Sequence, residues 1–147
     1  MKLAIEYQGS DERTGKRIVI YENNEVIGRT GYLSYPHDHI NYKKKIATMT
    51  VLVTDEKRDA IYGILVRNKY RKRGLGKLLL TKLIQETKKN FDELEISHIS
   101  EDVEKFYKKT FQGLKKAGKI KNYSIDKIYN NTYDGHENKC SNYKITL

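Results

Sequence analysis

The sequence predicts a mixed α/β fold, and three observations along the chain lead to that prediction. Up to about residue 60 the chain consists almost entirely of short segments with the alternation and β-branched content of strands. Residues 61–84 then have the pattern of a strand, a glycine-containing turn and a helix. After them come a further strand, a second helix and two candidate strands, which gives the order expected of one mixed sheet flanked by helices.

The N-terminal part has the pattern of antiparallel hairpins. We expect a turn within residues 9–15 and a tight turn at Asn23-Asn24, because asparagine tolerates the positive φ that two-residue hairpin turns require. Residues 36–45 are polar and are expected to form a loop. The predicted strands of this part are 3–7, 17–22, 26–35 and 46–54.

The segment from Ile61 to Val66 is apolar and β-branched, as in a buried strand, and the basic turn 67–73 follows it. Beyond the turn, Gly74-Leu75-Gly76 opens a helix with leucines at helical spacing that runs to about residue 90. The first amides of a helix have no intrahelical partner and carry partial positive charge, so such a turn can receive an anion. We therefore predict a diphosphate-binding loop here, surrounded by the charges of Arg71, Lys72, Arg73 and Lys77.

The C-terminal part predicts a short strand at 94–98 and a second helix. Ser100 is a candidate N-cap, acidic residues follow it in the first turn, and Gly118 is the expected C-terminal cap. The apolar face of this helix includes Phe106 and Tyr107. Two strands, 122–129 and 142–147, are expected to be joined by a turn at Asp134-Gly135.

Composition bounds the class of protein. The formal net charge of +10 favours anionic partners, such as a phosphate-bearing cofactor, nucleic acid or an acidic protein surface, although the lysines are dispersed as on an ordinary solvated surface. The sequence has neither an N-terminal signal-peptide pattern nor the ~20-residue apolar stretch of a membrane span. Its one cysteine, Cys140, is expected to be a surface thiol. We expect one cytoplasmic domain over residues 1–147, without membrane contact. Pro36-His37-Asp38-His39 lacks zinc-site spacing, so no metal site is expected.

The run Arg71-Lys72-Arg73-Gly74-Leu75-Gly76 is an R-x-x-G-x-G, preceded by Ile64-x-Val66 and Tyr70. It resembles the acetyl-CoA signature of the GNAT superfamily of N-acetyltransferases. The resemblance covers residues 60–117 and, more loosely, the two tail strands. It implies a central, mostly antiparallel sheet with a splayed strand pair, acetyl-CoA as the cofactor, and transfer of an acetyl group to a primary amine.

The resemblance also implies roles for particular residues. The turn, including Leu75 and Gly76, would bind the pyrophosphate, and the backbone of Leu65 and Val66 would pair with the pantetheine arm. Tyr107 would be the general acid, and Ser100 would contact the cofactor unless it is only an N-cap. The general base is open: His98 is the candidate we name. The acidic alternatives are Glu95 and Glu56, and a water chain is a further one.

Two features depart from the family pattern. The family commonly places two helices between its first two strands, and no segment here is long enough for them, so we expect the N-terminal acceptor helices to be reduced or absent. Thr110-Phe111 also stands where the family tends to have a glycine-aromatic pair. The acceptor therefore stays open among a small amine, a protein amine and an aminoacyl-tRNA. Two other readings compete: a basic nucleic-acid-binding module, and a non-catalytic CoA-binding relative. Oligomeric state is not predicted.

Overall fold

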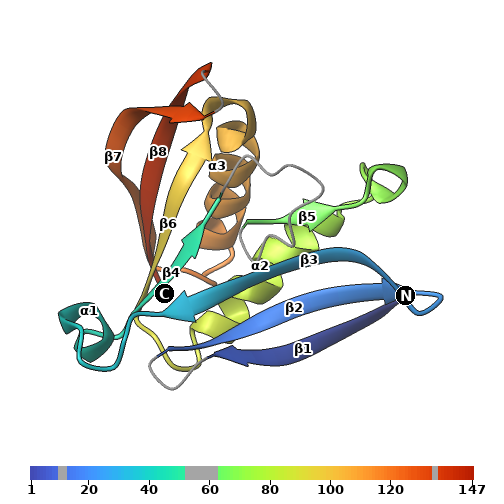
Figure 1. Ribbon diagram of the computed structural model, residues 1–147, viewed down its shortest axis with the longest axis horizontal. Helices are drawn as coiled ribbons and strands as arrows, with labels where there is room; N and C mark the ends of the chain where they lie inside the picture. The colour runs from blue at the N-terminus through green and yellow to red at the C-terminus, as the bar shows by residue number, and fades with distance from the viewer. Residues whose placement is uncertain (10–12, 52–62, 134–135) are drawn as a thin grey trace.

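A computed structural model describes residues 1–9, 13–51, 63–133 and 136–147 of the chain. Its elements form one eight-stranded sheet with helices packed on it (Figure 1). The strands are β1 (Lys2–Gly9), β2 (Thr14–Glu22), β3 (Glu25–Ser34), β4 (Ile46–Thr50), β5 (Leu65–Val66), β6 (Glu93–Ser100), β7 (Asn122–Tyr133) and β8 (His136–Thr146). The helices are α1 (Ile40–Lys43), the 3₁₀ turn η1 (Asn68–Tyr70), α2 (Leu75–Thr87) and α3 (Glu101–Lys116).

The sheet has two arms. Its strand order is β1-β2-β3-β4-β6-β8-β7, with β5 pairing separately with β3. All pairs are antiparallel except β4 with β6. Figure 1 shows β1–β3 diverging from β6–β8, with β4 joining the two arms. The predicted mixed, mostly antiparallel sheet is thus confirmed, and β4 and β6 are the pair at which it opens.

The N-terminal arm forms because its turns suit tight hairpins. Asn23 and Asn24 have φ of 52° and 64°, the left-handed values that asparagine tolerates, so the predicted tight turn is confirmed. Among the described residues no helix lies between β1 and β2, as expected of a chain without the usual acceptor helices. The short α1 lies instead between β3 and β4, inside the segment predicted to be a loop. One turn of helix forms there because the His39 side chain caps it by accepting from the Asn41 N–H at 3.0 Å.

The helices cover the sheet with the apolar faces that the sequence predicts. Helix α2 packs on β2 and β3, helix α3 packs on β6 and β8, and the two helices touch (Figure 1). Leu79 and Leu83 of α2 are fully buried, as is Phe111 of α3. A Cβ at Gly28 would lie 3.2 Å from the Leu79 side chain, so the glycine lets α2 sit close to β3. In the described part of the chain, no helix is both long and apolar enough to span a bilayer.

Four expectations need correction. The strand predicted from Ile61 is only β5, since Gly63, at φ 79°, and Ile64 lie outside it. Helix α2 ends at Thr87 instead of about residue 90. The tail hairpin is longer than predicted on both strands. Cys140 is not a surface thiol, because it lies in β8 with 3% of its surface exposed, and burial raises its pKa. The predictions for 10–12, 52–62 and 134–135 fall outside the described residues.

Candidate active site

The predicted anion-binding loop lies at the N-terminus of α2. Gly74 is the N-cap residue with φ 78°, a left-handed conformation that glycine adopts without steric cost. Lys72 also has positive φ, 63°, which is costly for a residue with a side chain. Helical bonding begins with the Leu78 N–H donating to the Gly74 carbonyl at 3.0 Å. The amides of the first turn therefore remain available for an anion.

The basic side chains of this loop divide into two groups. Arg71 donates from Nε to the Val66 carbonyl at 3.0 Å, which ties the loop back to β5. The Arg73 guanidinium lies over the Tyr70 ring at 5.2 Å, and Tyr70 is itself 7% exposed. Arg71, Lys72 and Lys77 line the adjacent pocket. Arg73 does not line it. Of the four predicted cations, three thus face a common space.

That space, here called the α2 pocket, has a volume of about 630 Å³. It lies where the sheet opens: β4 follows β6 as far as Thr50, and the Val51 N–H donates to the Ser97 carbonyl at 2.7 Å. The pocket is lined by the end of β4, the β5 region, the glycine loop and the start of α3. These lining residues are Val51, Gly63, Ile64, Val66, Tyr70, Arg71, Lys72, Gly74, Leu75, Gly76, Lys77, Ser100, Asp102, Val103, Phe106 and Tyr107.

One edge of β5 is paired with no strand of the described residues, and on it the Val66 carbonyl already accepts from Arg71 Nε, so the Val66 amide is the group left for a ligand. The Arg67 N–H donates to the Ile27 carbonyl of β3 at 2.9 Å, and successive residues of a strand alternate in direction. The Val66 amide therefore points away from β3, while that of Leu65 points toward it. Val66 lines the pocket and Leu65 does not.

Tyr107 reaches the pocket from α3 through an apolar wall. It is 2% exposed, and its ring makes an edge contact with Phe106 at 5.3 Å. Burial raises the pKa of Tyr107 above its ordinary value of 10.0, so the phenol keeps its proton at neutral pH. Ser100 also lines the pocket and is the α3 N-cap by position, but its side chain makes no capping hydrogen bond. An N-cap role alone therefore does not account for Ser100.

Sequence reasoning missed the wall residues Val51 and Phe106. A Cβ at Gly76 would lie 3.3 Å from the Phe106 ring. The second glycine of the motif therefore lets α2 pack closely against α3, besides leaving room for an anion at the start of α2. Phe106 precedes Tyr107 on the apolar face of a helix, which in sequence indicates only core packing. Nothing in the sequence places it against Gly76, thirty positions away.

The predicted base His98 lies outside the α2 pocket. It sits at a bulge in β6 with φ 61°, just where β4 leaves that strand. The Tyr129 hydroxyl donates its one proton to Asn142 Oδ1 at 2.9 Å and therefore accepts from the Nδ1–H of the His98 ring. Burial lowers the pKa of His98, so the imidazole is neutral near pH 7. The structure thus joins His98 to β7 and β8 and does not bring it to Tyr107.

The acidic alternatives are placed differently. Glu95 lies on β6, and its carboxylate accepts a hydrogen bond from the Tyr35 hydroxyl at 2.5 Å. It does not line the α2 pocket. Glu56 falls outside the described residues. Within the described ranges, no group of three or more His, Cys, Asp or Glu side chains is arranged to hold a metal ion.

Comparison with known proteins identifies the class that this fold and loop define. The model of the acetyltransferase (GNAT) family matches residues 2–111, and the chain belongs to that family. It is therefore an acetyl-CoA-dependent N-acetyltransferase that acts on an amine acceptor. The family match favours the transferase prediction over the basic nucleic-acid-binding module. A search of curated proteins finds no match.

Solved structures of similar fold agree with this assignment. An N-acetyltransferase from Staphylococcus aureus superposes with a TM-score of 0.62 at 19% identity, covering 90% of this chain and 67% of that one. Diaminobutyrate acetyltransferase EctA from Paenibacillus lautus, in complex with L-2,4-diaminobutyric acid and coenzyme A, gives 0.60 at 13% identity, covering 88% and 68%. NAA60 of Arabidopsis thaliana, in complex with acetyl-CoA, gives 0.53 at 11%, covering 94% and 78%. The likeness is one of fold, across varied acetyltransferases.

Proposed function

We propose that the α2 pocket binds acetyl-CoA and that its residues carry the transfer of the acetyl group to a primary amine. The observation that supports this most is that one pocket contains the glycine loop, the free edge of β5 and Tyr107. Acetyl-CoA supplies the acetyl group as a thioester, whose carbonyl carbon the amine attacks.

The loop Arg71–Gly76, with Lys77, binds the pyrophosphate. The first-turn amides of α2 donate to its oxygens, and the cations compensate its charge. Gly74 supports the turn, because the positive φ found there suits a residue without a Cβ. Leu75 anchors the start of the helix, since its side chain is 7% exposed and belongs to the core.

Val66 pairs with the pantetheine arm through its outward-facing backbone amide, with Leu65 holding β5 on β3 from the other side. Ser100 supplies a hydroxyl from the α3 end of the pocket. These contacts extend the cofactor from the loop toward the opening between β4 and β6, where the thioester would lie next to the wall that Phe106 and Tyr107 form.

Tyr107 is the proposed general acid. As the new C–N bond forms and the thioester C–S bond breaks, the departing sulfur takes the phenolic proton. The nitrogen loses one proton to solvent, and the tyrosine regains one from it. The raised pKa supports this role, because an acid must be protonated before it acts. The amine must arrive neutral. His98, neutral at pH 7 and at the strand opening, is the base we propose, acting through a water chain since it lies outside the pocket.

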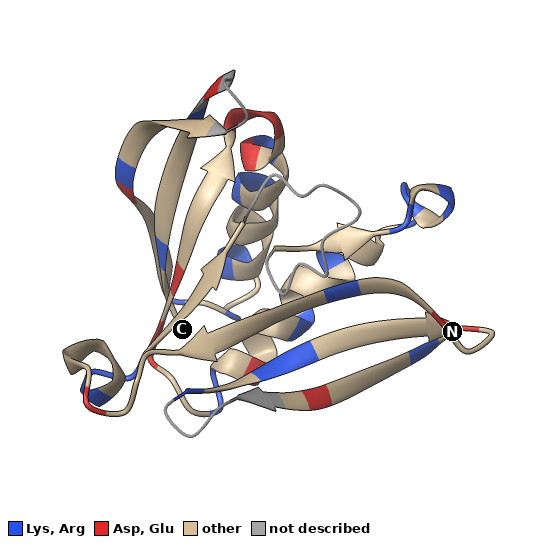
Figure 2. Cartoon of the chain, in the orientation of Figure 1, with Lys and Arg blue, Asp and Glu red and all other residues tan. Residues whose placement is uncertain are grey.

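The acceptor class is open between small amines, protein amines and aminoacyl-tRNA. Figure 2 shows Lys and Arg on both arms of the sheet and on the helices. The net charge of +10, and not its dispersed placement, supports attraction of an acceptor carried by nucleic acid or by an acidic protein surface. The protein would act as one domain in the cytoplasm.

The test is calorimetric titration with acetyl-CoA at low and moderate salt, on protein freed of nucleic acid. We expect one-to-one binding that survives moderate salt, because loop amides contribute as well as charges. Release of the CoA thiol should then be followed against a panel of small amines, peptides with free N-termini and aminoacyl-tRNA. Absence of acetyl-CoA binding under both salt conditions would refute the site assignment.

A further inference from the structure

A second hollow of about 580 Å³ lies at the other end of α2, and we call it the α1 pocket. It is formed by the adjoining ends of β1 and β2, by β3, by α1 with its flanking residues, and by the chain just after α2. Its described lining combines lysines with aromatic rings. The residues that matter to its chemistry are Tyr7, Lys16, His37, Tyr42, Lys43 and Lys45.

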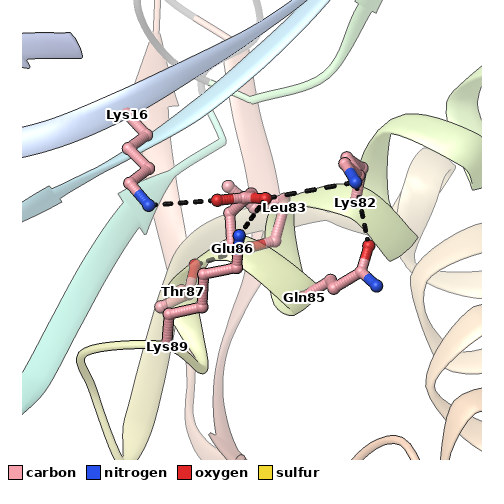
Figure 3. A network of polar contacts seen from close by, with 7 residues as sticks. All are labelled: Lys16, Lys82, Leu83, Gln85, Glu86, Thr87 and Lys89. Atoms are coloured by element: carbon pink, nitrogen blue, oxygen red, sulfur yellow. Dashed lines mark hydrogen bonds and ion pairs between the residues drawn. The ribbon is translucent and has the colours of Figure 1, made fainter. Parts of the chain in front are cut away.

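The floor of the α1 pocket carries excess positive charge. Lys16 Nζ lies 3.0 Å from a carboxylate oxygen of Glu86, a residue of α2 whose side chain is 3% exposed. The same carboxylate has Lys89 at 2.9 Å and Lys82 at 4.0 Å (Figure 3). Burial alone would raise the pKa of Glu86, but hydrogen bonds from Lys89 and Lys16 outweigh it and the pKa is lowered. One anion is thus shared by three cations, so the carboxylate partner of Lys16, the one of the three lysines that lines the hollow, does not cancel the positive charge of this cluster.

The rim adds charge without compensation. Lys43 and Lys45 are exposed and line the hollow, and no Asp or Glu occurs among its described lining residues. A concave surface with charges of one sign concentrates the opposite sign, and phosphate is the anion that ammonium groups hold well as point charges. The charge therefore selects an anionic ligand.

The rings make the ligand more specific. The Tyr7 side chain is 85% exposed, and Lys16 Nζ lies 5.8 Å from the centroid of its ring. The centroids of the His37 and Tyr42 rings lie 4.6 Å apart. Exposed rings next to lysines are how proteins bind nucleotides without reading sequence: a base stacks on the ring and the phosphate meets the cation. A simple anion needs no such rings.

The α1 pocket is separate from the acetyl-CoA site. The two share no lining residue. They lie at opposite ends of α2, whose 13 residues span about 20 Å. A small acceptor bound in one would not reach a thioester in the other.

We propose that the α1 pocket binds a nucleotide unit, with its base against the exposed rings and its phosphate on Lys43 and Lys45. The unit comes either from a free nucleotide or from single-stranded RNA. The inference does not rest on the proposed roles of the acetyl-CoA site.

The test is calorimetric titration of adenosine 5′-monophosphate into protein loaded with one equivalent of CoA. The α2 pocket is then filled without an excess of CoA, whose own adenosine phosphate would compete for the α1 pocket. Adenosine and inorganic phosphate are titrated as the two halves of the probe, and a short oligoadenylate as the RNA source. Lys43→Ala is compared with Lys44→Ala, its exposed neighbour, which does not line the hollow. Tyr7→Ala, at a highly exposed ring, tests stacking with little risk to folding.

We expect the monophosphate to bind more tightly than adenosine or phosphate. Lys43→Ala should weaken it about tenfold, the loss expected for one charge-assisted hydrogen bond, and Tyr7→Ala severalfold, while Lys44→Ala changes it little. Tighter binding of oligoadenylate with the same dependence on Lys43 identifies RNA as the source, and its absence identifies free nucleotide. No binding to the CoA-loaded protein, equal binding of phosphate or adenosine, or equal effects of the two lysine variants overturns the proposal. CoA binding is measured for every variant as well. A variant that binds CoA but not the monophosphate has lost the α1 pocket alone, whereas loss of CoA binding would report on the acetyl-CoA site.

Discussion

The buried carboxylate of Glu86 provides a sharp test of the energetics, through the substitution Glu86→Gln. Two unit charges at the 3.0 Å that separates Lys16 Nζ from Glu86 attract by about 5 kcal/mol at an effective dielectric constant of about 20. Part of this offsets desolvation, and removing one partner of a buried pair costs about 3–5 kcal/mol. Lys89, at 2.9 Å, and Lys82, at 4.0 Å, contact the same carboxylate from more exposed positions. We expect Glu86→Gln to lower the free energy of unfolding by about 3 kcal/mol, or roughly 10 °C in Tm.

The reciprocal substitution should cost less. Lys16→Met leaves the carboxylate with Lys89 and Lys82, and its apolar chain follows the path of the lysine stem, so we expect a loss of about 1 kcal/mol. The pKa of Glu86 lies below its ordinary value of 4.5, so the folded state binds this proton less readily than the unfolded chain does. Its stabilisation is therefore complete above pH 4.5 and lost as the pH falls through the folded pKa.

Urea unfolding at pH 7 and in a series below pH 4.5 measures both effects. The difference in unfolding free energy between the wild type and Glu86→Gln should be largest at pH 7 and should shrink in acid. Equal costs for the Glu86 and Lys16 variants, or a difference that does not depend on pH, would show that the surplus of lysines around this carboxylate does not act as argued.

The remaining predictions concern the active site. Gly76→Asp should abolish measurable acetyl-CoA binding, because the new side chain meets Phe106 and places a carboxylate at the anion site, whereas Gly113→Asp, at an open position of α3, should bind normally in calorimetry. Tyr107→Phe should lower kcat about 100-fold with the KM for acetyl-CoA unchanged, as for loss of a general acid; an unchanged rate would return the tyrosine to a packing role. His98 has a lowered pKa, so its contribution to stability is present above pH 6.5 and falls as the pH drops through the folded value. The Tm of His98→Asn should therefore decline less than that of the wild type as the pH falls below 6.5, and parallel dependences of Tm on pH would contradict the lowered pKa.

Local chemistry explains what could be predicted from the sequence. The Asn23-Asn24 turn, the leucine face of α2 and the glycine at the start of that helix depend on neighbours within a few residues. The same is true of the cofactor loop, whose R-x-x-G-x-G carries its conformation and its charges in one short run. The structure accordingly brings most of the predicted cofactor residues to one pocket.

Predictions failed where the outcome depended on distant partners. A polar tail suggested an exposed thiol, but β8 is covered by β6 and β7, which buries Cys140. Nothing in the sequence indicates that a bulge within β6 pairs the His98 ring with Tyr129, thirty-one residues away, and the role of His98 as the base stays a prediction. Bulges and side-chain partners of this kind follow from sheet register, which single-strand patterns do not specify.

The sequence by itself therefore determined the class of fold, the family and the position of the glycine turn at the start of α2, because each is written in contiguous residues whose backbone preferences and periodicity act locally. The tertiary structure alone decided how the parts meet. It placed Phe106 against Gly76, gave Val66 and not Leu65 the free edge of β5, and joined Lys16 to Glu86 across seventy residues to form the floor of a second pocket. These are long-range packing relations, set when the apolar faces of α2 and α3 are buried on the two arms of one sheet.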